Sequence, residues 1–391
     1  MNNGLEVALV SSEYPPLSIG GVSAVCYELS VSLAKNGVST TVFTAGNRSI
    51  TVERVNKYLK VVRFPVTSVP PRHFWFQVQN ISPLLRMLGK FDIIHDIDTQ
   101  AALLAYFRNR QKPFVTHVHG CKHCEAKAFL KSPFSSWTPG DFAYFALETP
   151  LNEFLTNTCM SNSDYLIVCN ASRVEEMKRR NPKLDFSKIS VIYNGIDFDR
   201  IDPENIGAKE KEGAILYYGR LYYNKGIVQL VNAIALVRKE FPNLRLDICG
   251  KGPLENKLRL LVKKLKLTEN VQIHGYTKYP DLVEKIRSAS VITLPSLYEG
   301  QPVAALEAMA HKKPVIMYDF PFSREFIKDW HDGMLARPRD VEDLAKRIGM
   351  ALSDKTLREK LSQNAYERVK KNHNWATLIH KYIDLYSKLK G

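Results

Sequence analysis

Two basic side chains, Arg220 and Lys225, lie in one short loop after an apolar segment, residues 214–218. A forked guanidinium and a compact ammonium both hold phosphate oxygens, and together they suit a diphosphate whose negative charge grows as a bond to it breaks. The alternative is a pair of solvated surface cations. The loop follows a predicted strand at its carboxyl end, where α/β proteins bind ligands, and this position favours anion binding.

Two carboxylates, Glu299 and Glu307, flank a polar turn further along the chain. The turn follows an apolar segment, residues 289–294, that suits a buried strand, and strong helix formers begin at Val303. Pro302 is predicted at the first helical position. Such a helix start attracts anions, and Glu307 near it suits hydrogen bonds from a sugar diol. The alternatives are a capping acid and an exposed helix residue; a glycosidase pair would have to flank one scissile bond, which two positions at one helix start do poorly.

His119 ends a predicted strand, residues 114–119, in the first half of the chain. A neutral imidazole there could donate a hydrogen bond to a sugar hydroxyl or a phosphate oxygen, and a histidine with no ligand is the alternative. The same segment contains further residues of the kinds that bind zinc: His117, Cys121, His123 and Cys124. Alternate spacing on a strand would put the first three of these on one side with His119. No second Cys or His pair lies nearby to complete a closed site, so no metal is predicted.

Glycines occupy two further strand-to-helix connections. Gly20 and Gly21 lie between an apolar strand, residues 7–10, and a helix predicted over residues 22–35. Gly250 and Gly252 follow another apolar strand and precede a helix. Because glycine lets the backbone approach a phosphate closely, both loops are predicted to face a ligand.

Strands and helices alternate along the whole chain, which is typical of doubly wound parallel sheets. A polar segment, residues 198–213, contains Pro203 and Gly207 and is the best linker, because the alternation restarts after it. The sequence therefore predicts two α/β domains, residues 1–197 and 198–374, with a ligand between them at the carboxyl ends of the strands. An amphipathic helix over about residues 375–391 is predicted to pack back on the first domain.

Composition excludes several classes of protein. The chain has 391 residues, of which 45% are hydrophobic and 24% charged, and no window approaches a membrane-spanning helix. Six scattered cysteines and a start without signal-peptide layout predict a cytoplasmic protein. The net charge of +15 predicts an anionic partner. With no nucleic-acid-binding pattern in the sequence, a phosphate-bearing substrate or an acidic membrane surface fits that charge better than nucleic acid.

The order and spacing of these segments resemble the retaining glycosyltransferases of family 4. Each segment is modest alone, but in this order they are specific. The matching segments are residues 15–21, 91–95, 118–120, 191–197, 218–221, 225–226 and 250–253, followed by Glu299 and Glu307 as the E-x7-E motif.

The resemblance implies the GT-B fold, two Rossmann-like doubly wound domains facing a central cleft. It implies transfer of a hexose-type sugar from a UDP- or GDP-sugar to a glycan or lipid-linked acceptor, as in polysaccharide or glycolipid biosynthesis, with no cofactor and no obligatory metal. Family resemblance also suggests that the departing phosphate helps to deprotonate the acceptor, so no protein nucleophile is expected.

The resemblance also assigns roles to residues. Arg220 and Lys225 would hold the diphosphate, Glu307 the ribose and Glu299 the donor sugar. His119 would lie beside the donor sugar, and it completes the predicted catalytic set. The remaining predicted donor-binding positions are Gly20, Gly21, Gly250, Gly252, Tyr276, Gln301 and Val303.

The chain departs from the family pattern at two places that bear on donor choice. Many members have Phe-Gly where this chain has Gln301 and Pro302. Proline lacks an N–H, and the Gln301 side-chain amide could replace it. Residues 311–313, His-Lys-Lys, stand where a glycine is usual before Pro314.

Two other interpretations remain beside this one. A sugar-nucleotide epimerase shares the GT-B architecture, and a non-catalytic sugar or nucleic-acid binder is disfavoured by the intact charged residues. The basic and aromatic segment Arg72–Gln79, with Leu84, Leu85 and Met87, could contact the inner face of the membrane and a lipid-linked acceptor, or form a core helix.

Overall fold

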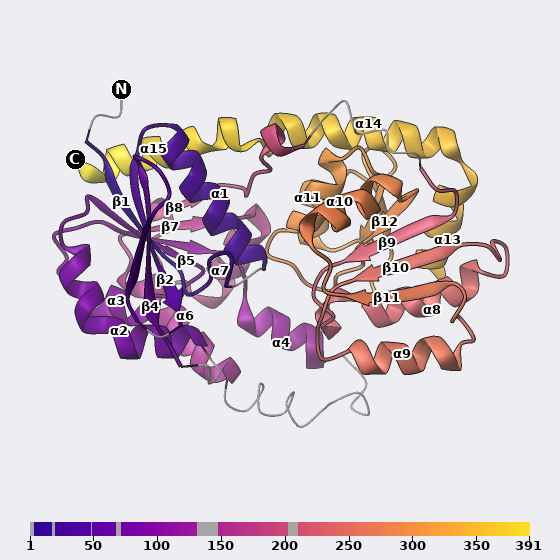
Figure 1. Ribbon diagram of the computed structural model, residues 1–391, viewed down its shortest axis with the longest axis horizontal. Coiled ribbons are helices and arrows are strands. Elements are labelled where there is room, and N and C mark those ends of the chain that lie inside the picture. The colour runs from indigo at the N-terminus through magenta and orange to yellow at the C-terminus, as the bar shows by residue number, and fades with distance from the viewer. Residues whose placement is uncertain (1–3, 18–19, 48, 68–71, 131–147, 202–209) are drawn as a thin grey trace. The chain divides into compact units, whose positions relative to one another are not determined.

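The computed structural model describes the chain except for residues 1–3, 18–19, 48, 68–71, 131–147 and 202–209 (Figure 1). The chain divides into two compact units. Unit 1 comprises residues 1–126, 134–195 and 375–391, and unit 2 comprises residues 127–133 and 196–374. Pro203 and Gly207 of the predicted linker, and residues 18–19 of the first family segment, lie outside the described residues.

Unit 1 is built on an eight-stranded sheet of order β3-β4-β2-β1-β5-β6-β7-β8. All neighbouring strands are parallel except β3 and β4, which form an antiparallel pair at one edge. The strands are β1 (Glu6–Val10), β2 (Ser39–Gly46), β3 (Thr51–Arg54), β4 (Leu59–Pro65), β5 (Ile93–Ile97), β6 (Phe114–Val118), β7 (Tyr165–Val168) and β8 (Ile189–Val191). The helices that begin in this unit are α1 (Gly21–Lys35), α2 (Arg72–Leu88), α3 (Ala102–Phe107), α4 (Lys122–Leu130), α6 (Thr149–Asn162), α7 (Ala171–Arg180) and α15 (Trp375–Lys390).

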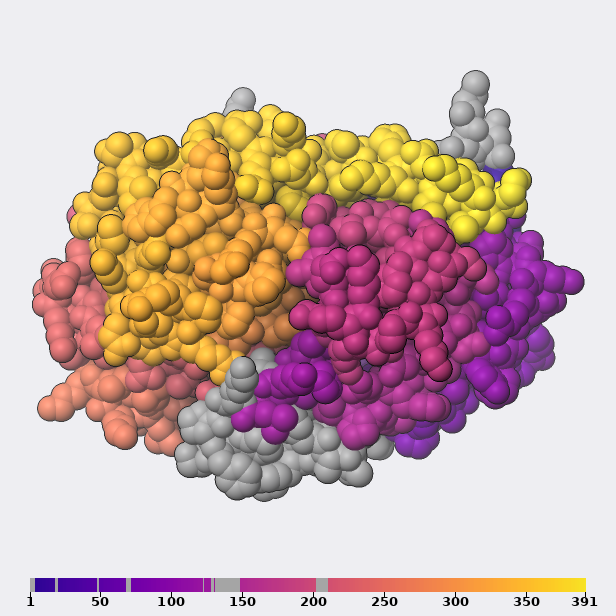
Figure 2. Space-filling view, turned by 180° about the vertical axis from the view of Figure 1, so that it is seen from behind, coloured from indigo at the N-terminus to yellow at the C-terminus, as the bar shows by residue number. Residues whose placement is uncertain are grey.

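The strands in the middle of the unit 1 sheet are largely buried, whereas the edge strand β3 is exposed. One face packs on α2, α3 and α6, where Ala8, Phe43 and Phe114 join a cluster with Phe76 and Leu104. Helices α1 and α15 pack together, α1 against β2 and α15 against β5. The C-terminal residues, bright yellow in Figure 2, lie on the surface of this unit.

Unit 2 is built on a six-stranded parallel sheet of order β11-β10-β9-β12-β13-β14. Helix α8 packs on α13, and α11 packs on α14. The strands are β9 (Ala214–Tyr218), β10 (Arg245–Cys249), β11 (Val271–Gly275), β12 (Val291–Thr293), β13 (Val315–Tyr318) and β14 (Met334–Ala336). The helices are α8 (Ile227–Val237), α9 (Glu255–Lys264), α10 (Tyr279–Ser288), α11 (Val303–Ala310), α12 (Pro321–Phe326), α13 (Val341–Ser353) and α14 (Lys355–Asn372).

The structure corrects three details of the sequence interpretation. Pro302 is the N-cap residue of α11 rather than its first helical residue. From the sequence, a strand is expected over residues 91–95 with a polar end at Asp96, but Asp96 belongs to β5 and is fully buried. The strand that was expected to include His119 ends at Val118.

The aromatic segment that begins at Arg72 forms α2, a core helix. Phe76, Leu84 and Leu88 are buried in the main cluster of unit 1, and Trp75 and Leu85 pack against it. Its apolar residues therefore serve the core. Within the described ranges, no helix is long and apolar enough to cross a membrane.

Candidate functional site

The sheet of unit 2 reverses its winding at β9. Strands β10 and β11 lie on one side of β9, and β12, β13 and β14 lie on the other. The loops that leave the carboxyl ends of β9 and β12 are therefore neighbours at a topological switch point, where open α/β sheets bind ligands. These two loops carry Arg220, Lys225 and Glu299.

Backbone hydrogen bonds tie the β9 loop to both of its neighbours. The Leu221 N–H donates to the Lys251 carbonyl at 2.9 Å, on the loop after β10. On the other side, the Leu297 N–H donates to the Asn224 carbonyl at 2.7 Å. Lys225 ends a short 3-10 helix, Tyr223–Lys225. Its backbone is therefore held in place independently of the contacts that its side chain makes.

Glycines let these loops approach one another. Gly226 has a φ of 65°, and a Cβ there would lie 1.8 Å from the carbonyl oxygen of Pro295. Gly250 has a φ of 154°, and a Cβ there would lie 1.8 Å from the carbonyl oxygen of Gly219. A Cβ on Gly252 would lie 2.4 Å from the carbonyl oxygen of Leu221. No other residue type fits these three positions without moving backbone.

The Lys225 ammonium lies 2.5 Å from Oε1 of Glu299, and both side chains are 17% exposed. The Ser296 hydroxyl donates to the same oxygen at 2.8 Å. The Arg220 guanidinium lies 5.0 Å from the centre of the Tyr222 ring, and both residues are exposed. The structure thus joins Lys225 to Glu299 across the two loops and leaves Arg220 at the surface beside them.

Glu307 lies in α11, beyond its first turn, and is half-buried. Burial, with the negative charge of Glu307 as the next contribution, raises the pKa of Tyr218 well above its usual value. The Tyr218 hydroxyl donates to the Ala304 carbonyl at 2.6 Å, which ties the end of β9 to α11. Gln301 is buried, and Val303 begins α11 with its N–H bonded to the Gln301 carbonyl at 2.9 Å.

Tyr276 follows β11 directly and is 52% exposed. Its strand is two places away from β9 in the sheet, beyond β10. The carboxyl ends of three adjacent strands therefore carry, in order, Tyr276, the Gly250–Gly252 loop and the Arg220 loop.

Unit 1 holds the remaining predicted residues at the carboxyl ends of β1 and β6. Gly20 is the N-cap of α1 in extended conformation, and a Cβ built on Gly21 would meet nothing within 4 Å. His119 is buried, and burial lowers its pKa to about 3, so the imidazole is neutral at physiological pH. Its Nε2 atom is buried and has no hydrogen-bond partner among the described residues.

The histidines of this segment do not form the four-ligand row that alternate strand spacing suggested. The rings of His117 and His119 lie 3.8 Å apart between centres, and His117 also stacks on His95. After Val118 the strand pattern ends, so Cys121 and Cys124 instead meet Glu176 of α7. A carboxylate 52 residues beyond Cys124 could not be found from local spacing.

The sequence analysis also did not identify Ser296 and Tyr218 as residues of the candidate site. Ser296 precedes Glu299 by three residues, but the turn that brings its hydroxyl to the carboxylate is visible only in the structure. Tyr218 was placed in a strand and in the family segment 218–221 with no role of its own, yet its hydroxyl reaches the helix that carries Glu307.

Comparison with known proteins identifies the family. Residues 19–200 match the sequence model described as Glycosyltransferase Family 4, and residues 198–368 match Glycosyl transferases group 1. An uncharacterized glycosyltransferase of Methanocaldococcus jannaschii is 28% identical over 401 residues, which covers 98% of each chain. Together the two models cover most of the chain.

Solved structures show the same fold. Sucrose-phosphate synthase from Thermosynechococcus elongatus superposes with a TM-score of 0.82 at 21% identity, covering 98% of this chain and 99% of the other. Anabaena HepE, in complex with UDP-glucose, superposes with a TM-score of 0.74 at 15% identity, covering 98% of this chain and 100% of the other. This chain is a member of glycosyltransferase family 4 with the GT-B fold, a retaining hexosyltransferase that moves a sugar from a nucleotide-sugar donor to a glycan or lipid acceptor.

Proposed function

We propose that the donor is a UDP-hexose, bound by unit 2 at the loops that follow β9, β10 and β12. The observation that carries this proposal is the Lys225–Glu299 contact at the switch point of the sheet. A nucleotide sugar joins a diphosphate to a sugar. The cation suits the diphosphate, and the neighbouring carboxylate suits the hydroxyls of the sugar. The UDP-glucose in the HepE structure supports uridine as the base.

Lys225 and Arg220 bind the diphosphate in this proposal. The Lys225 ammonium is held by a fixed backbone and is largely shielded from solvent, which strengthens its attraction for phosphate oxygens. Arg220 is exposed and can offer its planar fork to the same group. Both cations stabilise the charge that grows on the diphosphate as the bond to the sugar breaks.

Glu307 accepts hydrogen bonds from the two ribose hydroxyls. It is half-buried and lies beyond the first turn of α11. The buried Tyr218 hydroxyl bonds to the Ala304 carbonyl and so fixes the helix that carries this carboxylate. The backbone at Gly250, Gly252 and Tyr276, at the carboxyl ends of β10 and β11, faces the base.

Glu299 binds hydroxyls of the donor sugar, with Gln301 and the start of α11 at Val303 beside it. From unit 1, His119 offers a neutral imidazole whose buried Nε2 has no partner among the described residues, which suits a hydrogen bond with a sugar hydroxyl. The Gly20–Gly21 turn has open space at Gly21 for a phosphate or sugar oxygen. These roles make His119 and Glu299 positioning groups for a sugar whose leaving group the cations hold.

Calorimetric titration with UDP and GDP tests the donor assignment. UDP is expected to bind more tightly than GDP, and Lys225→Ala is expected to weaken UDP binding by about 10- to 100-fold, the effect of losing one charge-assisted hydrogen bond. Lys263→Ala, at an exposed lysine of α9, is the matched control and should bind UDP like the wild type. Equal binding by Lys225→Ala and the wild type would overturn the proposed diphosphate site.

The ribose assignment has its own test. The wild type is expected to bind 2′-deoxy-UDP about tenfold more weakly than UDP, because one hydrogen bond to Glu307 is lost. Glu307→Ala should bind both nucleotides weakly and equally. If Glu307→Ala still bound UDP more tightly than 2′-deoxy-UDP, Glu307 would not be the residue that binds the ribose.

A further inference from the structure

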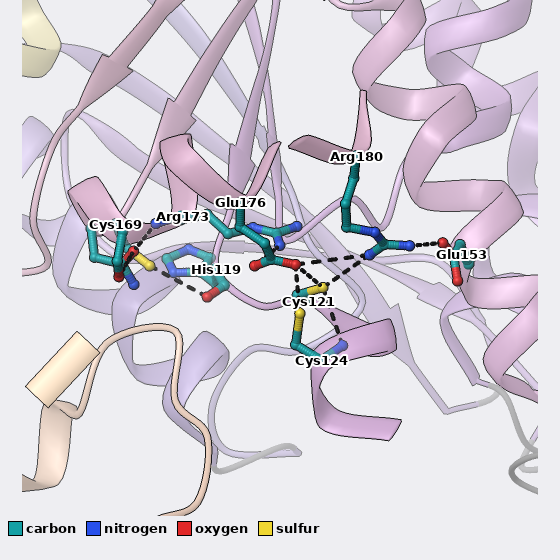
Figure 3. A network of polar contacts seen from close by, with 10 residues as sticks. His119, Cys121, Cys124, Glu153, Cys169, Arg173, Glu176 and Arg180 are labelled. Carbon is teal, nitrogen blue, oxygen red and sulfur yellow. Dashed lines mark hydrogen bonds and ion pairs between the residues drawn. The ribbon is translucent and has the colours of Figure 1, made fainter. Parts of the chain in front are cut away.

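Two cysteines of unit 1 converge on one carboxylate oxygen outside the proposed donor site. Cys121 directly precedes α4, and Cys124 lies on the first turn of that helix. Oε1 of Glu176, on α7, accepts hydrogen bonds from the Cys121 thiol at 2.8 Å and from the Cys124 thiol at 2.5 Å (Figure 3). The two sulfur atoms and the oxygen all lie within 4.8 Å of one another.

Two thiols and one carboxylate oxygen converge here, and these are donor types that can hold one divalent ion. Zinc is bound by cysteine sulfur and by carboxylate oxygen, usually with four ligands in a tetrahedron. Cys121 is buried and Cys124 and Glu176 are partly buried, so the three donor atoms are held by packing. The short C-x-x-C spacing at a helix start is a common zinc-binding arrangement.

Neighbouring groups orient the donors. The Cys124 N–H donates to the Cys121 sulfur at 3.2 Å, and the Arg180 guanidinium donates to the same sulfur at 3.2 Å. Such outer contacts hold metal ligands in place and tune their basicity.

Arg173 and Arg180 lie near the proposed ion, but they do not repel it on balance because the net charge of the cluster does not change when zinc replaces two protons. Zn²⁺ would displace the two thiol protons, so the cluster gains two positive charges and two negative charges together. The Arg173 guanidinium bonds to the other oxygen of Glu176 at 2.6 Å, and this pair is retained. The Arg180–Glu153 ion pair is likewise unaffected.

A small cavity adjoins the cluster at Cys121. Its volume is about 20 Å³, the space of roughly one water molecule. Cys121 and His123 line this cavity with Arg180 and Glu153. The His123 ring nitrogen Nδ1 lies 3.5 Å from a Glu153 oxygen, so this face of the cluster is polar.

We propose that Cys121, Cys124 and Glu176 form a structural Zn²⁺ site, with water from the adjoining cavity as the fourth ligand. The ion would join the start of α4 to α7 by coordinate bonds in place of thiol hydrogen bonds. This site lies in unit 1 and takes no part in the proposed contacts with the nucleotide. It is therefore independent of the donor assignment.

Metal content and cobalt titration test the site. Wild-type protein purified with a thiol reductant is expected to contain one zinc ion per chain by mass spectrometry under native conditions. After chelation, Co²⁺ should restore one equivalent, with a sulfur-to-cobalt charge-transfer band and release of two protons per ion. A wild type that binds neither metal would overturn the proposal, and so would an intramolecular Cys121–Cys124 disulfide that excludes metal.

Three variants assign the ligands. Cys124→Ser should lose the charge-transfer intensity of one sulfur and bind Co²⁺ at least about 100-fold more weakly, and Glu176→Gln should keep both sulfur bands but bind about 10- to 100-fold more weakly. Cys26→Ser, at a buried cysteine of α1 outside the cluster, is the matched control and should bind like the wild type. Circular dichroism verifies that each variant is folded. Wild-type affinity in Cys124→Ser or in Glu176→Gln would exclude that residue as a ligand and overturn the site as proposed.

Discussion

Gly226 lies directly against the carbonyl of Pro295, and this contact sets the distance between the two loops that carry Lys225 and Glu299. A Cβ at residue 226 would lie 1.8 Å from that oxygen and 2.9 Å from the carbonyl carbon. The backbone of Gly226 is also left-handed, with a φ of 65°. Conformation and space thus both require glycine at the residue that follows Lys225.

Gly226→Ala should therefore destabilise the protein strongly. Two backbone segments would have to separate, and the left-handed conformation adds its own cost, so we expect the free energy of unfolding to fall by about 2–4 kcal/mol. Chemical denaturation measures this loss. Gly89→Ala is the control, because a Cβ there meets nothing within 4 Å and its φ is not left-handed, and its effect should stay within about 0.5 kcal/mol.

Glu299→Gln should separate nucleotide binding from turnover. The carboxylate holds the Lys225 ammonium at 2.5 Å, so neutralising it frees that cation for the diphosphate and removes a nearby negative charge. We expect UDP to bind about three- to tenfold more tightly to the variant, while the rate of sugar transfer falls because the hydrogen bond to the donor sugar is no longer charge-assisted. Calorimetry with UDP measures the first effect. Weaker binding of UDP would show that Glu299 does not compete for Lys225.

The fold could be predicted from sequence because its signals are local. Buried parallel strands are continuously apolar, and segments such as Val7–Val10 and Ala214–Tyr218 are therefore visible without a structure. The ends of strands were predicted less accurately where polar residues are buried. Asp96 belongs to β5 and is fully buried, so its polarity misled the assignment of the strand end, which was predicted at His95.

Contacts between distant segments could not be predicted. Local spacing indicated Lys225 and Glu299 separately, but only the sheet order shows that β9 and β12 are neighbours and that the two side chains meet. Likewise, Cys121 and Cys124 were visible as possible metal ligands, whereas Glu176 reaches them only through the packing of α7. Local sequence spacing cannot reveal a contact between side chains that lie in different helices or strands.

Lys266→Gly should stabilise unit 2. Lys266 follows α9 with a left-handed φ of 55°, and the Leu267 N–H closes the helix end by bonding to the Val262 carbonyl at 2.9 Å. Glycine adopts this conformation without cost, so we expect a gain of about 1 kcal/mol in the free energy of unfolding. Lys263→Gly, within the helix, makes the same chemical change at a helical residue and should lose about 1 kcal/mol. Equal effects of the two substitutions would contradict this interpretation.

The buried carboxyl of Asp96 should make stability depend on pH. Burial, with the nearby charge of Asp98 as a further contribution, raises its pKa from 3.8 to about 7, although the Cys159 thiol and the Gln100 N–H donate to its oxygens at 2.9 Å each. Between these two pKa values the folded chain binds a proton that the unfolded chain has released. The contribution of Asp96 to stability is therefore complete below about pH 4 and is lost as pH rises to about 7.

Asp96→Asn isolates this effect, because asparagine stays neutral and its carbonyl can still accept from the Gln100 N–H. We expect the free energy of unfolding of the wild type to fall relative to that of Asp96→Asn as pH rises from about 4 to about 7, and to change no further above that range. Denaturant unfolding of both proteins across this range measures the difference. A difference that does not vary with pH would mean that Asp96 is already ionised in the folded protein at pH 4, stabilised by its three hydrogen-bond donors, Cys159, Gln100 and Thr116.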